Sequence, residues 1–227
     1  MKLRNAARQA GFTLVEIAIV LVIIGLLLVG VLQGQEMMEN SKIKAVANDM
    51  KGVQAAYYGY IDRYKVPPGD ELAATMAARG WAGAAGTTGD ASGVLAMDPA
   101  DTFVNGASSA TQEQRSFWRA LRGSGLISGD AALVGVPALP LHSANGTIGV
   151  ASGTVYGLSG VFVCASGLTP KIAGALDAMF DGPGAASNTG KLRGNNNAAA
   201  PLIPGNAAVA AAYLETTPNL WTVCLKI

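Results

Sequence analysis

The sequence predicts an α+β fold in which a long N-terminal helix, half of it transmembrane, packs on a small antiparallel sheet with long loops. Three features carry this prediction: 21 mostly apolar residues from Phe12 to Leu32, an amphipathic stripe that continues them to Tyr64, and β-branched segments beyond Thr147. The apolar run is the most informative feature, because about 20 apolar residues are what a helix needs to cross a bilayer.

The charges before the apolar run predict its orientation. Lys2, Arg4 and Arg8 precede it, and no acidic residue does. Basic residues favour the cytoplasmic side of a membrane-spanning helix. We therefore expect a single-pass protein with a cytoplasmic N-terminus, a transmembrane segment over about residues 12–34 and an exported C-terminal part.

Two features distinguish the run from an ordinary anchor or a secretory signal. Glu16 places a carboxylate within the apolar run, where an ionisable group is costly and usually has a function. The basic leader ends at Gly11, directly before the run, and no clear A-x-A cleavage site follows it. A cut between Gly11 and Phe12 would keep the helix and create a new amine on Phe12.

At these residues the chain is similar to a known family. The segment Gly11-Phe12-Thr13-Leu14-Val15-Glu16 resembles the class III leader of type IV pilins and type II secretion pseudopilins. The resemblance implies that residues 1–11 are a prepilin leader, that prepilin peptidase cuts after Gly11, and that Phe12 is then methylated. It also implies that Glu16 pairs with the Phe12 amine of a neighbouring subunit during assembly.

Two further positions, one in the apolar run and one directly after it, bear on this resemblance. Gly25 stands where pilins commonly carry a glycine, whereas Gln33 replaces a proline that many pilins and pseudopilins have. The departure leaves open whether the helix melts near Gln33 in a filament, as it does in some pili. Gly30 and Gly34 form a G-x-x-x-G pair, which permits close approach between helices.

The helix is expected to continue beyond the membrane, over residues 12–66. Apolar residues recur at spacings of three and four from Ile43 to Tyr64, the period of a helix with one buried side. Pro67-Pro68 then ends it. The aromatic end of the stripe favours packing on a sheet, with a free coiled coil as the alternative. Residues 64–70, YKVPPGD, resemble the turn after the long helix in pseudopilin-like sequences.

Residues 67–227 are expected to form the exported globular α+β domain. Phe117, Trp118 and Leu121 predict a helix that ends at Gly123, and Ile172–Phe180 predicts another short helix. We expect loops over 80–110 and 129–147, and residues 183–208 are a low-complexity segment of Gly, Asn and Ala.

Three segments are predicted to be strands. They are Thr154–Tyr156, Val161–Cys164 and Leu220–Ile227, with glycines that suggest turns or bulges. In the last segment Trp221, Val223, Leu225 and Ile227 share one face, and Cys224 lies on the more polar opposite face of what we expect to be an edge strand.

The two cysteines, Cys164 and Cys224, both lie in the exported part. An oxidising periplasm favours one disulfide between them, with two buried free thiols as the alternative.

Composition agrees with one small exported domain rather than a large enzyme core. Hydrophobic residues make up 50% and charged residues 14% of the chain, which has 29 glycines and 10 prolines. Without residues 1–11, which carry three basic residues and no acid, 13 basic and 15 acidic residues remain. This nearly even charge balance gives no indication that the protein binds nucleic acid or an acidic substrate.

The sequence carries no motif for catalysis. His142 is the one histidine, which excludes a multi-histidine metal site, and there is no nucleophile elbow, P-loop or dinucleotide-binding signature. We therefore expect no enzyme activity, no cofactor and no small-molecule substrate.

Two weaker patterns have alternative interpretations. Arg115, Arg119 and Arg122 form a basic stripe on the predicted middle helix, either a solvated face or a contact for nucleic acid or an acidic neighbour. Asp177 and Asp181 are either a repelling pair on an exposed helix end or oxygen ligands for Ca²⁺, as some pseudopilins bind calcium in their C-terminal region.

Taken together, the resemblance implies a structural subunit of a type IV pilus or a type II secretion pseudopilus. Its partners would be copies of itself or other pilin-like subunits, prepilin peptidase, an inner-membrane assembly platform and lipid. One alternative is a minor pilin that acts as an assembly primer, an adhesin or a DNA-binding tip. Another is a monomeric single-pass anchor for a periplasmic binding domain.

Overall fold

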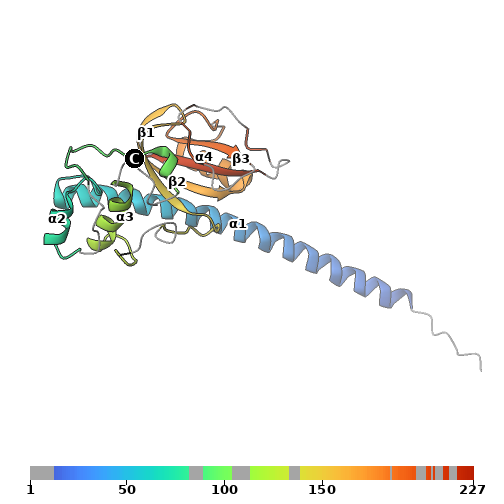
Figure 1. Ribbon diagram of the computed structural model, residues 1–227. Coiled ribbons are helices and arrows are strands. Elements are labelled where there is room, and N and C mark those ends of the chain that lie inside the picture. Colours follow the sequence, from blue (N-terminus) through green and yellow to red (C-terminus); the bar gives the residue numbers. More distant parts are fainter. Residues whose placement is uncertain are drawn as a thin grey trace, which may run out of the picture. The chain divides into compact units, whose positions relative to one another are not determined.

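The computed structural model describes residues 13–81, 89–103, 113–132, 139–184, 186–197, 203–205, 207, 212–214 and 219–227. Figure 1 shows the chain as a ribbon. The elements in chain order are α1 (Leu14–Tyr64), α2 (Ala73–Ala78), the 3₁₀ turn η1 (Pro99–Asp101), α3 (Glu113–Gly123), β1 (Ile148–Val155), β2 (Leu158–Leu168), α4 (Pro170–Asp181), β3 (Leu192–Asn197) and β4 (Leu220–Lys226). The predicted α+β class, with a long N-terminal helix on a small antiparallel sheet, is confirmed.

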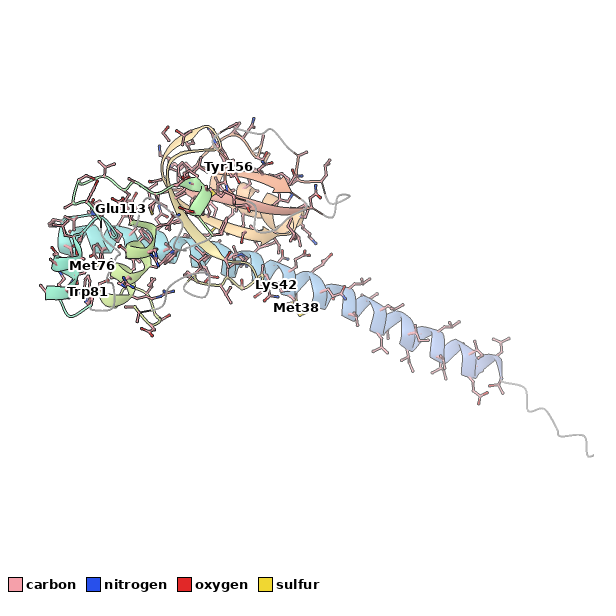
Figure 2. All side chains as sticks on the ribbon, viewed as in Figure 1. Met38, Lys42, Met76, Trp81, Glu113 and Tyr156 are labelled. Carbon is pink, nitrogen blue, oxygen red and sulfur yellow. A yellow bond between two sulfur atoms is a disulfide. The ribbon has the colours of Figure 1, made fainter. Side chains whose placement is uncertain are left out.

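The first part of α1 is apolar all round and exposed, as Figure 2 shows by the side chains that project along it. None of the residues in its most apolar stretch is buried. By length and composition, this part is suited to cross a membrane. Residues up to Ser41 form one compact unit, and Lys42–Ile227 form a second.

Within the second unit, α1 buries the stripe that the sequence predicts. Ile43, Val46, Met50, Val53 and Tyr60 are buried in the core, and the remaining tyrosines of the stripe pack against it. The same core contains the largest buried side chains of α3, β2 and β4, which are Phe117, Trp118, Phe162 and Trp221. Hydrophobic burial therefore fixes this part of α1 on the sheet.

The long helix ends where the prolines begin. Lys65 follows the last residue of α1 with φ +61°, and its N–H donates to the Ile61 carbonyl. Gly69 has φ +102°, and a Cβ placed on it would lie 2.6 Å from the Glu113 carbonyl oxygen. Glycine is needed here both for the backbone conformation and for the close approach of this turn to α3.

The four strands form one antiparallel sheet in the order β1-β2-β4-β3. β1 and β2 are joined by Tyr156 and Gly157, which both have positive φ, as a two-residue type I′ turn requires. The prediction that Tyr156 continues a strand is therefore wrong. The pairing of β2 with β4 shifts between Ala165 and Leu168, and this confirms a glycine-containing irregularity, at Gly167.

β4 differs from the prediction in its place in the sheet. It lies between β2 and β3, so it is an inner strand and not an edge strand. Thr222 and Cys224 on its predicted polar side are as fully buried as Trp221 and Val223 on the other. The edge position is taken by β3, which forms inside the segment that we interpreted as low-complexity sequence. Its Leu-Arg-Gly-Asn-Asn-Asn run has little intrinsic preference for a strand, and pairing with β4 overrides that preference.

Candidate functional site

The start of α1 is held by reciprocal hydrogen bonds between Thr13 and Glu16. The Thr13 N–H and the Thr13 hydroxyl both donate to Glu16 Oε2, each at 2.8 Å, and the Glu16 N–H donates to Thr13 Oγ1 at 3.3 Å. This is a capping box, in which the residue before the helix and the third helical residue satisfy each other's N–H groups.

The capping box changes the expected role of Glu16. The resemblance implies a partner for this carboxylate on a neighbouring subunit, but within its own chain one of its oxygens already accepts two hydrogen bonds. The Thr-x-x-Glu spacing was the signal for this arrangement, and it was missed. The other oxygen, Oε1, has no hydrogen bond among those found for the described residues. The cleavage position itself, Gly11 and Phe12, lies outside the described residues.

Cys164 and Cys224 form a disulfide that joins β2 directly to β4. The two residues are opposite each other in the antiparallel register, with their Cα atoms 4.0 Å apart. Both are fully buried. The bridge therefore lies inside the sheet and connects its two inner strands, which makes it a structural crosslink.

The arginines of α3 do not form a solvated stripe. Arg119 is only 3% exposed, and its Nε donates to the Ala131 carbonyl at 3.0 Å. Burial, with a smaller effect of the Arg115 charge, lowers the pKa of Arg119. Arg115 and Arg122 are half-buried. The solvated-face interpretation is wrong for Arg119, and this buried guanidinium is not accessible to a nucleic-acid phosphate.

Asp177 and Asp181 have separate structural roles. Asp177 is fully buried and accepts a hydrogen bond from the Tyr213 hydroxyl at 2.8 Å, so it is not part of an exposed repelling pair. Burial raises the pKa of Asp177. Asp181 accepts the backbone N–H groups of Lys191 and Leu192 at 2.9 and 2.7 Å. Asp181 thus fixes the entry into β3.

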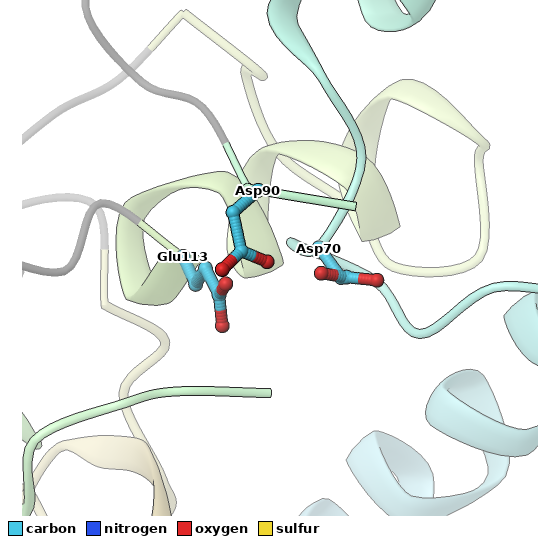
Figure 3. A group of neighbouring side chains, drawn as sticks. All are labelled: Asp70, Asp90 and Glu113. Carbon is cyan, nitrogen blue, oxygen red and sulfur yellow. The ribbon is translucent and has the colours of Figure 1, made fainter. Parts of the chain in front are cut away.

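A different set of carboxylates comes together among the described residues. Asp70, Asp90 and Glu113 each offer an oxygen, and these atoms lie within 4.8 Å of one another (Figure 3). Asp70 follows the turn after α1, Asp90 lies in the next loop and Glu113 begins α3. No spacing in the sequence signals this group, because its members are 20 to 43 positions apart.

Each of the three carboxylates accepts a hydrogen bond from at least one backbone N–H group. Asp70 accepts hydrogen bonds from the N–H groups of Ser92 and Gly93 at 3.0 and 2.8 Å, Asp90 also accepts from Ser92 at 2.9 Å, and Glu113 accepts from Ala96. Burial raises the pKa of Glu113, whereas the Ser92 bonds lower that of Asp90. An oxygen set of this kind suits a hard cation such as Ca²⁺, but its visible role is to hold the 89–97 loop.

The comparison with protein families matches the N-terminal segment. The family model described as the prokaryotic N-terminal methylation motif matches residues 6–32. Comparison with curated proteins and with solved structures finds no significant match. The match marks a class III prepilin-type leader, as in type IV pilins and pseudopilins. Together with the exposed apolar part of α1, it indicates a membrane-anchored pilin-like precursor that is processed by prepilin peptidase and assembles with other pilin subunits.

Proposed function

We propose that the chain is a structural subunit of a type IV pilus or a type II secretion pseudopilus, and that it works by assembly and not by catalysis. The observation that carries this proposal is the methylation motif over residues 6–32, which overlaps the part of α1 that is apolar all round and has no buried residue. A helix that is apolar all round needs lipid or other apolar helices around it.

Before assembly, lipid surrounds the first part of α1. The N-terminus is cytoplasmic and the Lys42–Ile227 unit is periplasmic, as the basic leader favours. Cleavage after Gly11 leaves Phe12 as the new N-terminus, directly before Thr13. Glu16 is then near the cytoplasmic interface, where a carboxylate is less costly than at the bilayer centre.

During assembly, helices of neighbouring subunits replace the lipid. A Cβ placed on Gly25, Gly30 or Gly34 would meet nothing within 4 Å, so these positions are free for close approach by another helix. In such a bundle an ionised carboxylate needs a partner. The Phe12 amine of an adjacent subunit supplies it, and Glu16 Oε1 is the oxygen left for it by the capping box. The pair fixes the axial register of two helices.

Intact-mass measurement of the protein from its native host tests the proposal. We expect a chain that begins at Phe12 and carries one methyl group. Gly11→Leu should block processing, because a bulky side chain replaces the small residue before the cut, whereas Gly25→Leu serves as a control that leaves the cleavage position intact. A mature chain that still begins at Met1 in the presence of prepilin peptidase would contradict the proposal.

A further inference from the structure

The Lys42–Ile227 unit contains a groove lined by three lysines and no acidic residue. The groove has a volume of about 590 Å³ and lies between α1, the end of α4 and the end of β4. Lys51 comes from α1, Lys191 from the segment before β3, and Lys226 from the end of β4. Leu158, Phe180 and Leu225 give the groove an apolar wall. We call it the lysine groove.

Within the described part of the chain, the lysines of the groove form no ion pair with an acidic side chain. Neither of the two ion pairs found there involves its lysines. Asp181 lies beside the groove and reduces its positive charge, but the backbone N–H groups of Lys191 and Leu192 donate to its two oxygens, so it is not paired with a lysine. Lys51 Nζ lies 5.2 Å from the centroid of the Phe180 ring, so this ammonium contacts the apolar wall. The groove is therefore suited to an acidic segment with a small apolar surface.

The same unit presents such a segment on another side of the sheet. Residues 98–101, Asp-Pro-Ala-Asp, form the turn η1 with its preceding cap, and we call them the acidic turn. Asp98 is the extended residue that caps the turn, and its Oδ1 accepts the Ala100 N–H at 2.8 Å, so Asp98 and Asp101 place two negative charges on one short turn. Asp98 and Ala100 are exposed, and neither aspartate is in an ion pair.

The acidic turn is held rigidly on β1. The buried Ser152 hydroxyl donates to the Leu95 carbonyl and accepts from the Met97 N–H, both at 2.7 Å, just before the turn. After it, the Thr102 hydroxyl donates to the Pro99 carbonyl at 2.7 Å. Since a rigid segment loses little conformational entropy when it binds, the turn is preorganised for a contact.

We propose that the acidic turn of one copy of this chain docks in the lysine groove of a second copy. β2 separates β1, which carries the turn, from β4, which lines the groove, and no residue of the turn lines the groove. The contact is therefore between two different surfaces. A contact of this type repeats from copy to copy and builds a ring or an open helical filament. The inference rests on the proposed function and names the contact between its exported units.

Carbodiimide crosslinking tests the contact directly, because it joins a lysine amine to a carboxylate only when they touch. The full chain is purified in detergent, and copies labelled with ¹⁵N are mixed with unlabelled ones. We expect mixed-isotope crosslinks from Lys191 or Lys226 to Asp98 or Asp101. Their yield should fall when salt is raised from about 0.05 to about 0.5 M, which shortens the range of charge interactions. Crosslinks of these lysines only within one copy, or only to carboxylates outside the acidic turn, would overturn the proposal.

A charge swap in the native host gives the second test. Lys191→Glu with Lys226→Glu, or Asp98→Lys with Asp101→Lys, should each lower filament incorporation about tenfold or more, because like charges then face each other. All four changes in one chain should restore it. Lys42→Glu with Lys44→Glu is the matched control, since it makes the same charge change outside the groove.

The outcomes separate this inference from the proposed function. If wild-type protein forms filaments and each reversed pair incorporates normally, the inference is wrong and the function stands. The inference is also wrong if the variant with all four changes is present at wild-type membrane levels but its filament incorporation is not restored. If wild-type protein forms no filament at all, the proposed function fails, and the mixed-isotope crosslink alone decides the contact.

Discussion

Removing the disulfide should destabilise the Lys42–Ile227 unit by about 4 kcal/mol. The bridge closes a loop with a sequence separation of 60 residues. The chain-entropy model assigns such a loop about 4 kcal/mol, within the range of about 2–5 kcal/mol typical for native disulfides of small secreted domains. Both half-cystines are fully buried on the two inner strands. The side chains that replace them therefore need to be apolar.

Cys164→Ala with Cys224→Ala is the cleanest variant. A serine pair would add two buried hydroxyl groups, and each one left without a partner costs about 1–3 kcal/mol. Denaturant unfolding of the full chain in detergent, followed by tryptophan fluorescence, measures the effect, because the buried Trp221 belongs to the same strand as Cys224. The alanine variant should lose about 4 kcal/mol, or about 8–16 °C in Tm, and the serine variant more. A loss below about 1 kcal/mol for the alanine variant would refute this reasoning.

Two further predictions concern buried polar groups of the same unit. Ser152→Ala should cost about 1–3 kcal/mol in the same unfolding assay, because it leaves the Met97 N–H and the Leu95 carbonyl without their buried partner; an unchanged unfolding midpoint would contradict this. His142 is buried, with Nε2 2.8 Å from the Ser166 carbonyl and Nδ1 accepting the Ala144 N–H, and burial lowers its pKa. The folded state therefore binds fewer protons than the unfolded state, so the stabilisation is present above the ordinary pKa of about 6.5 and is lost as pH falls below it, by at most about 1.4 kcal/mol per pH unit. Unfolding curves at several pH values should show this loss for the wild type and less of it for His142→Gln, and equal pH dependence of the two would be evidence against it.

The helices α1, α3 and α4 followed from patterns within the sequence, whereas the short helix α2 was not predicted. The stripe from Ile43 to Tyr64 and the prolines after it predicted both the buried side of α1 and its end. The apolar side chains of α3 and the glycine that ends it were also sufficient, because a helix is stabilised by contacts between residues close in sequence. Thr169 caps α4 through a hydrogen bond to the Ile172 N–H, which is another local signal.

The sheet was less predictable because its order depends on residues distant in sequence. β3 takes its conformation from β4, and the position of β4 between β2 and β3 is visible only once the strands pair. The turn at Tyr156 was missed because a tyrosine is unusual at positive φ. The burial of Arg119 also depends on long-range packing, since its spacing alone is that of an exposed face.

The candidate site likewise contains residues that the sequence could predict and residues that it could not. The leader, Phe12 and Glu16 were proposed from a contiguous motif, and the family match covers that motif. The capping box of Thr13 and Glu16 had a four-residue signature and was still missed. The group of Asp70, Asp90 and Glu113 had none, because folding of two loops onto α3 brings these side chains together.

Filament incorporation of Glu16→Ala tests the central claim most directly, with Glu36→Ala as the matched control at the other end of the apolar run. Both variants lie outside the Lys42–Ile227 unit, so both should be inserted, processed and disulfide-bonded at wild-type levels. The sheared filament fraction is measured at equal membrane levels. We predict that Glu36→Ala incorporates normally and that incorporation of Glu16→Ala falls sharply, because its helices lose the carboxylate that sets their register. Equal incorporation of the two variants would contradict the account.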